Sequence, residues 1–330
     1  MKISILFIFL VSTLLTCTQA EEVHRVSVRT HSGAEKGLKV WGPTMDYLST
    51  TIPGHRFEMI PYPQIEAQLE DARQNKFQFI LTNPSTFIEV KNISGTYALV
   101  TLVNKRQNTA QTRFGSVIFT RADRDDIIHL HDLKGKHLKV VSALAFGGWQ
   151  VAWREMLQND FNPHDELRQL SFAGGNQPTV VNAVLEGEAD AGVVRTDMLE
   201  RLAKNGKINM TDLRILHNIE TPGFPFFHST PLYPEWPFAA MTGTDSKLIT
   251  QVKQALLSMK EDLPAARTGN YHGWTDALDY SEVEKLLIEL GVSQSETSNR
   301  FSTIMKASII SLTIILAFVF ALRARQKRIA

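Results

Sequence analysis

The feature of this sequence that most restricts its fold is a motif that occurs three times: an apolar strand that leads directly into the start of a helix. The clearest copy is Lys139–Arg154, where a β-rich opening breaks at Phe146-Gly147-Gly148 and helical spacing follows. Because the first amides of a helix lack intrahelical partners and carry the positive end of its dipole, such a start attracts anions. We expect this turn to form one wall of a small-molecule cleft. The alternative is a tight turn that binds no ligand.

The other two copies of the motif lie on either side of this one. Asn83–Thr86 follows the predicted strand Phe77–Leu81, and Gly174–Asn176 lies between the predicted strand Leu170–Phe172 and the helix Thr179–Leu185. In open α/β sheets, ligands bind where the carboxyl ends of strands meet helix starts. We therefore expect amides from three separate helix starts to face one gap.

The first part of the chain alternates strands and amphipathic helices. Strands are predicted at Val23–Arg29 and Phe57–Pro61, with helices at Gly37–Thr50 and Ile65–Gln74, and Lys105–Thr112 is predicted to be a polar loop. This alternation is typical of an α/β sheet covered by helices on both faces. The segment Leu213–Ile219 is expected to carry the chain back to the first domain.

The first twenty residues have the pattern of a secretory signal peptide. Lys2 precedes the apolar run Ile3–Leu15, and Thr18-Gln19-Ala20 provides a cleavage site after Ala20. Cys17 is the only cysteine, so residues beyond this segment form no disulfide and offer no thiol nucleophile or cysteine metal ligand. A lipoprotein signal is the alternative, but Leu14-Leu15-Thr16 fits it poorly.

A second hydrophobic segment lies near the other end of the sequence. Residues 304–322 are almost wholly apolar and long enough to span a bilayer, and a basic tail follows at 323–330. By the positive-inside rule the tail is cytoplasmic, which places the main domain outside a bacterial inner membrane. A buried hydrophobic helix is the alternative.

Short motifs in a fixed order carry a resemblance to a known family. They are Trp41 with Asp46-Tyr47-Leu48, Asn83-Pro84, Asp132–Lys136, Phe146–Trp149, Gly187–Arg195, and Ser229-Thr230 followed by Tyr233–Pro237. Together they resemble the PhnD-like (phosphate/phosphite/phosphonate-type) branch of the type II periplasmic solute-binding proteins. Within that branch the sequence is most similar to the periplasmic sensor module of tetrathionate-sensor-type histidine kinases.

The resemblance implies an α/β type II periplasmic-binding-protein fold: two α/β lobes joined by two crossovers, with the ligand between them. Lobe I would comprise 21–112 and 220–298, and lobe II 113–219. A linker at 299–303 would precede the transmembrane helix 304–322.

Candidate ligand-binding residues come from the helix starts, from strand ends and from positions that contact ligand in relatives. They are Asn83, Pro84, Ser85, Thr86, Ser116, Ser142, Phe146, Gly147, Gly148, Trp149, Gly174, Gly175, Asn176 and Arg195. Arg195 suits bidentate binding of an anion, and its alternative role is an ion pair with Asp190 or Asp197. The transport-type relatives hold phosphonate oxygens with Ser and Thr in the turn that here reads Ser142–Gly148. Most of those hydroxyls are missing here, which argues against phosphonate itself.

No catalytic residue, metal site or cofactor is predicted. The sequence has no Gly-x-Ser-x-Gly, His-Glu-x-x-His or P-loop pattern. We interpret the histidines of His129-Leu130-His131 as two loop residues rather than as metal ligands. A net charge of +1 without a basic stripe argues against a nucleic-acid partner.

Two binding functions remain, and an enzyme is the disfavoured third. The first is a membrane-anchored periplasmic receptor that closes on a small anionic solute and signals to a partner, as in a two-component system. The second is a tethered substrate-binding protein of an ABC transporter. The partner would be a histidine kinase or an ABC permease. Because the sensor kinases continue past the membrane helix and this sequence stops at Ala330, we expect any signal to pass to another protein.

Overall fold

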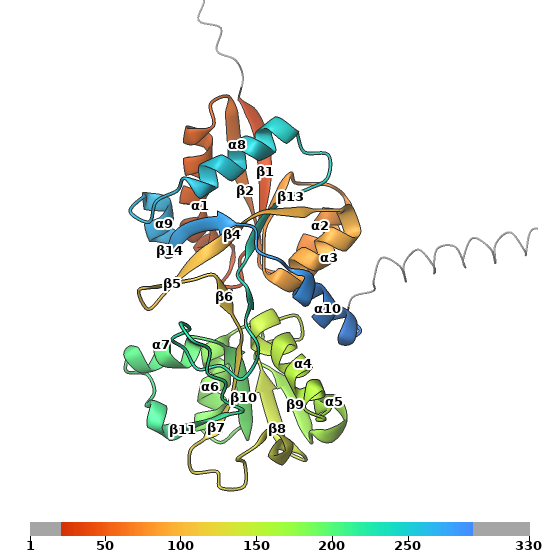
Figure 1. Cartoon of the computed structure of the whole chain (residues 1–330), viewed down its shortest axis with the longest axis vertical. Helices are drawn as coiled ribbons and strands as arrows, with labels where there is room; N and C mark the ends of the chain where they lie inside the picture. Colours follow the sequence, from red (N-terminus) through yellow and green to blue (C-terminus); the bar gives the residue numbers. More distant parts are fainter. Residues whose placement is uncertain (1–20, 293–330) are drawn as a thin grey trace, which may run out of the picture.

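A computed structural model describes residues 21–292 as two α/β lobes stacked along the long axis of the molecule (Figure 1). The predicted signal peptide 1–20, linker 299–303, membrane helix 304–322 and basic tail 323–330 lie outside the described residues. Within residues 21–292, no helix combines the length and the apolar character needed to cross a bilayer.

Lobe I is built on a sheet of order β14-β4-β13-β3-β1-β2, with β5 paired to β4. Its strands are β1 (Glu22–Arg29), β2 (His55–Tyr62), β3 (Phe79–Leu81), β4 (Tyr97–Arg106), β5 (Thr109–Gln111), β13 (Pro237–Ala240) and β14 (Tyr271–Asp276). Its helices are α1 (Ala34–Thr51), α2 (Ile65–Arg73), α3 (Pro84–Ser94), α8 (Ser246–Leu257), α9 (Pro264–Gly269) and α10 (Ser281–Glu289). Strand β1 runs parallel to β2 and β3, so these three strands end at one edge, as the strand–helix alternation predicts.

Lobe II has a five-stranded sheet of order β11-β7-β10-β8-β9. Its strands are β7 (Ser116–Arg121), β8 (His137–Val140), β9 (Gln169–Phe172), β10 (Ala191–Arg195) and β11 (Leu213–Leu216). Its helical elements are η1 (Leu130–Leu133), η2 (Phe146–Gln150), α4 (Val151–Gln158), α5 (Pro163–Glu166), α6 (Gln177–Leu185), α7 (Met198–Lys204) and η3 (Met210–Asp212).

The two lobes are joined where β6 (Arg113–Phe114) pairs antiparallel with β12 (Tyr233–Pro234). This return lies further along the chain than the boundary at 220 that we predicted. Strand β11 pairs with β7 at the edge of the second sheet. Ser229 is also held there, because its N–H donates to the Ser116 carbonyl at 2.8 Å and its hydroxyl to the Leu216 carbonyl at 2.7 Å. The chain therefore leaves lobe II only after Thr230.

The predicted polar loop at 105–112 is wrong. Strand β4 continues to Arg106, turns through Gln107 and Asn108, and returns as β5. Both turn residues have positive φ (48° and 69°), which is the geometry of a tight hairpin turn usually made with glycine. Because neither residue is glycine, the usual hairpin signal is missing from the sequence.

The hydrophobic core of lobe I is divided by its sheet. One cluster packs α1 and α8 against the side of the sheet that carries Val26, Val28 and Phe79. The cluster on the opposite side includes α3 and α10 and continues into lobe II through Phe146 and Val151. The lobes therefore share apolar packing along one flank.

Candidate functional site

A cleft of about 850 Å³ lies between the lobes, and residues of both lobes line it. Its walls include the starts of all three predicted anion-binding helices. These are Asn83 before α3, Ala145–Gly148 at the start of η2, and Asn176–Pro178 at the start of α6. The common gap that we expected from the sequence is therefore present in the structure.

The start of α3 presents one side chain to the cleft. Asn83 is the N-cap: its Oδ1 accepts from the Thr86 N–H at 3.0 Å and the Ser85 hydroxyl at 2.8 Å, while its Nδ2 donates to the Thr86 hydroxyl at 3.1 Å. Asn83 lines the cleft, but Pro84, Ser85 and Thr86 are buried beneath it and are not part of its wall. Their polar groups are already used to cap the helix.

The glycine pair lies inside a wide helical turn, η2, that runs directly into α4, rather than in a loop before the helix. A Cβ at Gly147 would lie 2.6 Å from the Phe114 ring, and one at Gly148 would lie 2.5 Å from Val141. Only glycine therefore lets the turn approach the crossover so closely.

Other candidates near this turn have different environments. Ser142, Phe146, Gly147 and Gly148 line the cleft. Trp149 does not; it is 1% exposed and its ring stacks on Trp153 in the core of lobe II. Ser116 is fully buried and its hydroxyl donates to the Gly147 carbonyl at 2.8 Å, so it positions the turn from behind.

The start of α6 contributes Gly174, Gly175 and Asn176, all of which line the cleft. The two glycines have φ values of 63° and 95°, in the left-handed region that favours glycine. Asn176 caps the helix, its Oδ1 accepting from the Thr179 N–H at 3.4 Å.

Arg195 ends β10 in the cleft wall, and its ion-pair partner differs from both predicted alternatives. It pairs with Glu235, which is fully buried and also accepts from Asn104 Nδ2 at 3.0 Å. Asp190 instead binds Arg124 at 2.6 Å, and Asp197 lies 3.7 Å from Arg106. Glu235 comes from the crossover segment, which sequence spacing does not place beside β10.

The Arg195 guanidinium is held in place but is not fully paired. Its Cζ lies 4.0 Å above the centroid of the Phe114 ring. Within residues 21–292, its Nε and the Oε2 of Glu235 have no hydrogen-bond partner. Both of these atoms are buried, and it is one terminal nitrogen of Arg195 that binds Glu235.

The cleft carries a strong excess of positive charge. Its lining contains five Arg and Lys side chains and one carboxylate, Asp197. The cations are Arg29, Lys36, Arg106, Arg195 and Arg201. Three of them, Arg29, Lys36 and Arg201, form no ion pair within residues 21–292. A small anion would supply the missing negative charge.

Two pKa shifts follow from this environment. Burial, and after it the charge of Arg195, lowers the pKa of Arg106 to about 10, which leaves it protonated at neutral pH. Partial desolvation between the cleft walls lowers the pKa of His31, and the charges of Arg29 and Arg195 lower it further. His31 is therefore neutral at pH 7 although it still faces solvent.

Several cleft residues were not predicted as site residues. Arg106 lies in the stretch predicted to be a loop. Thr268 and Gly269 belong to α9, and Asn270 lies between α9 and β14, two elements that were not predicted. The alternation of Tyr271, Gly273 and Thr275 was the available signal for β14. Trp41 and Trp236, which belong to the family motifs but were not predicted to bind ligand, add aromatic surface to the walls.

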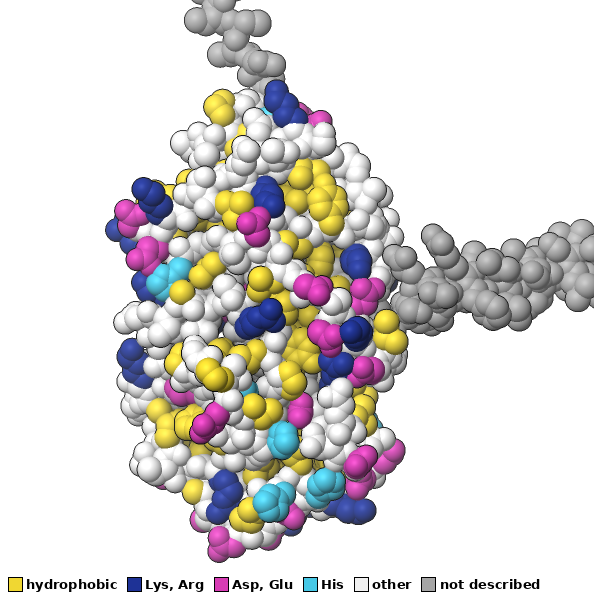
Figure 2. Space-filling view, viewed as in Figure 1, with side chains coloured by type: hydrophobic (Ala, Val, Ile, Leu, Met, Phe, Trp, Pro, Cys, Tyr) yellow, Lys and Arg dark blue, Asp and Glu magenta, His cyan; other side chains and the backbone are white. Residues whose placement is uncertain are grey.

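Charge on the outer surface is distributed differently. Figure 2 shows Lys and Arg interspersed with Asp and Glu over the visible face of the molecule. The two signs of charge are therefore mixed on this face, in keeping with a net charge of +1.

Comparison with known proteins gives a match to one family model over residues 28–281. Its description is ABC transporter, phosphonate, periplasmic substrate-binding protein. A curated relative, the tetrathionate sensor histidine kinase TtrS of Salmonella typhimurium, is 33% identical over 248 residues. That alignment covers 75% of this chain and 40% of the relative, so the chain spans less than half of the kinase's length.

Solved structures of similar fold include PhnD1 of Prochlorococcus marinus in complex with methylphosphonate. It has a TM-score of 0.64 and 14% identity, with coverage of 82% of this chain and 99% of that one. A binding-protein component of a phosphonate ABC transporter from Pseudomonas aeruginosa has a TM-score of 0.61 and 12% identity, with coverage of 90% and 98%. These likenesses support the two-lobed α/β fold predicted from the sequence motifs.

Proposed function

The chain belongs to the family of phosphonate-type periplasmic substrate-binding proteins, and on that premise we propose that it is a membrane-anchored sensor of a small divalent oxyanion. The anion would bridge the lobes and favour the closed arrangement. The predicted helix 304–322 would anchor the domain and carry the change to a signalling partner, as in a two-component system.

One observation carries this proposal: three helix starts from both lobes and five cationic side chains face one cleft that contains a single carboxylate. Helix amides and arginines are the groups that proteins use to bind oxyanions. Because the groups come from both lobes, an anion there would draw the lobes together.

A sulfur oxyanion fits the cleft better than a phosphonate. The hydroxyl-poor turn Ser142–Gly148 offers few neutral donors, whereas the walls offer apolar surface from Trp41, Phe114 and Trp236. An anion with charged ends and a polarisable, weakly hydrated middle would use both features. Tetrathionate, after which the 33% identical sensor kinase is named, is such a molecule and is the first probe to use.

The test is calorimetry on the full chain in detergent, with tetrathionate, thiosulfate, sulfate, phosphate and methylphosphonate titrated separately. We expect one site per chain and a dissociation constant below about 100 µM for a sulfur oxyanion, equivalent to about 5.5 kcal/mol of binding free energy. If none of the five anions releases heat or raises the melting temperature, the proposal fails.

A second candidate is a tethered substrate-binding protein of an ABC transporter, which the description of the matching family model favours. The genes beside this one separate the two candidates. A permease and an ATPase would indicate transport, and a kinase with a response regulator would indicate sensing. Both candidates require the same cleft, so calorimetry alone does not distinguish them.

A further inference from the structure

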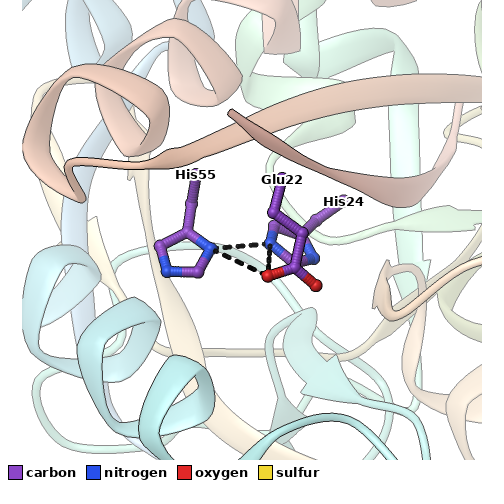
Figure 3. A group of neighbouring side chains, drawn as sticks. All are labelled: Glu22, His24 and His55. Atoms are coloured by element: carbon purple, nitrogen blue, oxygen red, sulfur yellow. Dashed lines mark hydrogen bonds and ion pairs between the residues drawn. The ribbon is translucent and has the colours of Figure 1, made fainter. Parts of the chain in front are cut away.

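Three side chains of the types that ligate metal ions meet at the end of lobe I remote from the cleft. Figure 3 shows Glu22 and His24 on β1 pointing toward His55 at the start of β2. One ligand atom from each lies within 4.8 Å of the other two. Residues 21–292 contain no other such group of His, Cys, Asp and Glu, and the His129–His131 pair is not part of one.

The strand pairing explains why these residues meet. Glu22 and His24 are two residues apart, so both point to the same face of β1. The parallel register pairs Glu22 with His55, and Glu22 N–H donates to the Gly54 carbonyl at 2.9 Å. The His24 ring also packs against Phe57, with 5.5 Å between ring centroids. Two adjacent strands of a sheet thus hold all three side chains.

The distances are close to those of a coordinated ion. His24 Nε2 lies 2.8 Å from His55 Nδ1, and the Glu22 Oε2 lies 4.0 Å and 3.8 Å from these two nitrogens. Tetrahedral zinc, with bonds of about 2.0–2.1 Å, holds its ligand atoms about 3.3 Å apart. Changes of about 0.5–0.7 Å in these distances, which small side-chain rotations provide, reach that geometry. Without a metal, one imidazole N–H must donate to the other ring.

The surroundings are suited to a divalent cation. His24 is buried, at 4% exposure, and packs against Phe57, so its ring is held in place beside His55. The Glu22 side chain is 71% exposed, which leaves an entry path and space for water ligands. Two neutral imidazoles and one carboxylate are a donor set that zinc accepts.

We propose that Glu22, His24 and His55 form a binding site for a divalent transition metal, with Zn²⁺ as the best-fitting ion. The ion would join the starts of β1 and β2, which pair in parallel without a direct turn between them. It would lie about 20 Å from the cleft, because β1 spans its eight residues at about 3.3 Å each. Its role would therefore be to stabilise lobe I, separately from solute binding.

The experiment uses the full chain in detergent, purified without a polyhistidine tag and stripped of metal with EDTA. Zn²⁺ is titrated by calorimetry, and Co²⁺ is titrated while its visible absorption reports tetrahedral coordination. The variants are His55→Ala and Glu22→Gln. The matched control is His272→Ala, because His272 is 22% exposed, as His55 is at 23%, and also pairs with a glutamate, Glu261, but lacks a second histidine.

We expect one zinc ion per chain, with the affinity reduced at least about 100-fold in His55→Ala, since loss of an outer-shell partner alone costs about 10- to 100-fold. Glu22→Gln should reduce the affinity about tenfold, and His272→Ala should leave it unchanged. Since Glu22 is exposed, its variant remains informative if His55→Ala does not fold. The proposal is overturned if the wild type binds no zinc, or if both variants bind it as the wild type does. Tetrathionate binding is independent of either outcome.

Discussion

Two arginines of lobe II, Arg195 and Arg154, bind glutamates from outside that lobe and differ in how completely they are paired. Arg154, on α4, donates its Nε and one terminal nitrogen to both oxygens of Glu289 on α10, at 2.6 and 2.8 Å. Its remaining nitrogen donates to the Tyr233 hydroxyl at 2.8 Å. Arg195 binds one oxygen of Glu235 and leaves its Nε without a partner in the described part of the chain.

The difference favours a structural role for Arg154 and leaves Arg195, which lines the cleft, as the candidate for ligand binding. Each of the three guanidinium nitrogens of Arg154 donates to Glu289 or Tyr233, so Arg154 fastens α4 to α10. Arg195 lines the cleft, and it is held by one carboxylate and by the Phe114 ring. From the sequence, Arg195 is a candidate ligand-binding residue and Arg154 is not.

The largest expected effect comes from Arg195→Ala. We expect the affinity for tetrathionate to fall at least about 100-fold, because the variant removes a charged contact and leaves Glu235 buried without its cation. Calorimetry measures the loss. Arg154→Ala is the matched control and should change the affinity less than about threefold. Equal losses in the two variants would contradict the difference in role between the two arginines.

The next largest effect is expected from Gly147→Ala, which tests the close packing of Gly147 against Phe114 beside Arg195. The new methyl group would lie 2.6 Å from the Phe114 ring and 3.4 Å from the Arg195 side chain. We expect destabilisation of about 1–3 kcal/mol from overpacking, measured by urea unfolding. Gly42→Ala, in α1 with no atom within 4 Å of the added carbon, should be neutral or stabilising. Equal effects at the two sites would rule out the close approach.

A smaller effect is expected from Glu289→Gln, which changes the partner of Arg154. The variant keeps the shape of the side chain but removes its charge, and the Glu289 side chain is 45% exposed. We expect a loss of about 1 kcal/mol of unfolding free energy. Salt should reduce this difference, which urea unfolding at low and high ionic strength measures. A loss that does not depend on salt would show that the ion pair is not its cause.

The smallest effect concerns Glu89, on α3 beside the shared apolar flank. Burial raises the pKa of Glu89 to about 7, above the value near 4.3 expected in the unfolded chain. Between these values the folded state binds more protons, so stability falls as the pH rises through about 4.5–7. Glu89→Gln should stabilise the protein by up to about 1 kcal/mol at pH 8 and have no effect at pH 4. Thermal melts at both pH values measure this, and an effect independent of pH would contradict it.

Local patterns predict much of this fold. Asn83 as a helix cap and Pro84 at the first helical position predict the helix that follows. In the structure Asn83 caps α3, which starts at Pro84. The three helix starts were predicted because each follows an apolar strand. Their convergence on one cleft follows from the general rule for parallel strands.

Long-range pairing explains what the sequence did not reveal. Glu235 lies 40 residues from Arg195, and His55 lies 31 residues from His24. The first pair depends on where the chain returns to lobe I, and the second depends on the register of two parallel strands. Neither property is encoded in a local period of 2 or 3.6 residues. The sequence therefore predicted the types of these elements but not the individual contacts between them.

The Arg154–Glu289 pair also has a mechanical consequence. Helix α10 belongs to lobe I, where Glu284 binds Lys91 of α3 at 2.8 Å. Its last residue, Glu289, is nevertheless bound by Arg154 of lobe II. Figure 1 places α10 beside α4 at the waist of the molecule. If one lobe rotates against the other, either the Arg154–Glu289 ion pair breaks or α10 tilts relative to lobe I. The residues that follow α10 in the sequence are therefore joined to a helix that contacts both lobes.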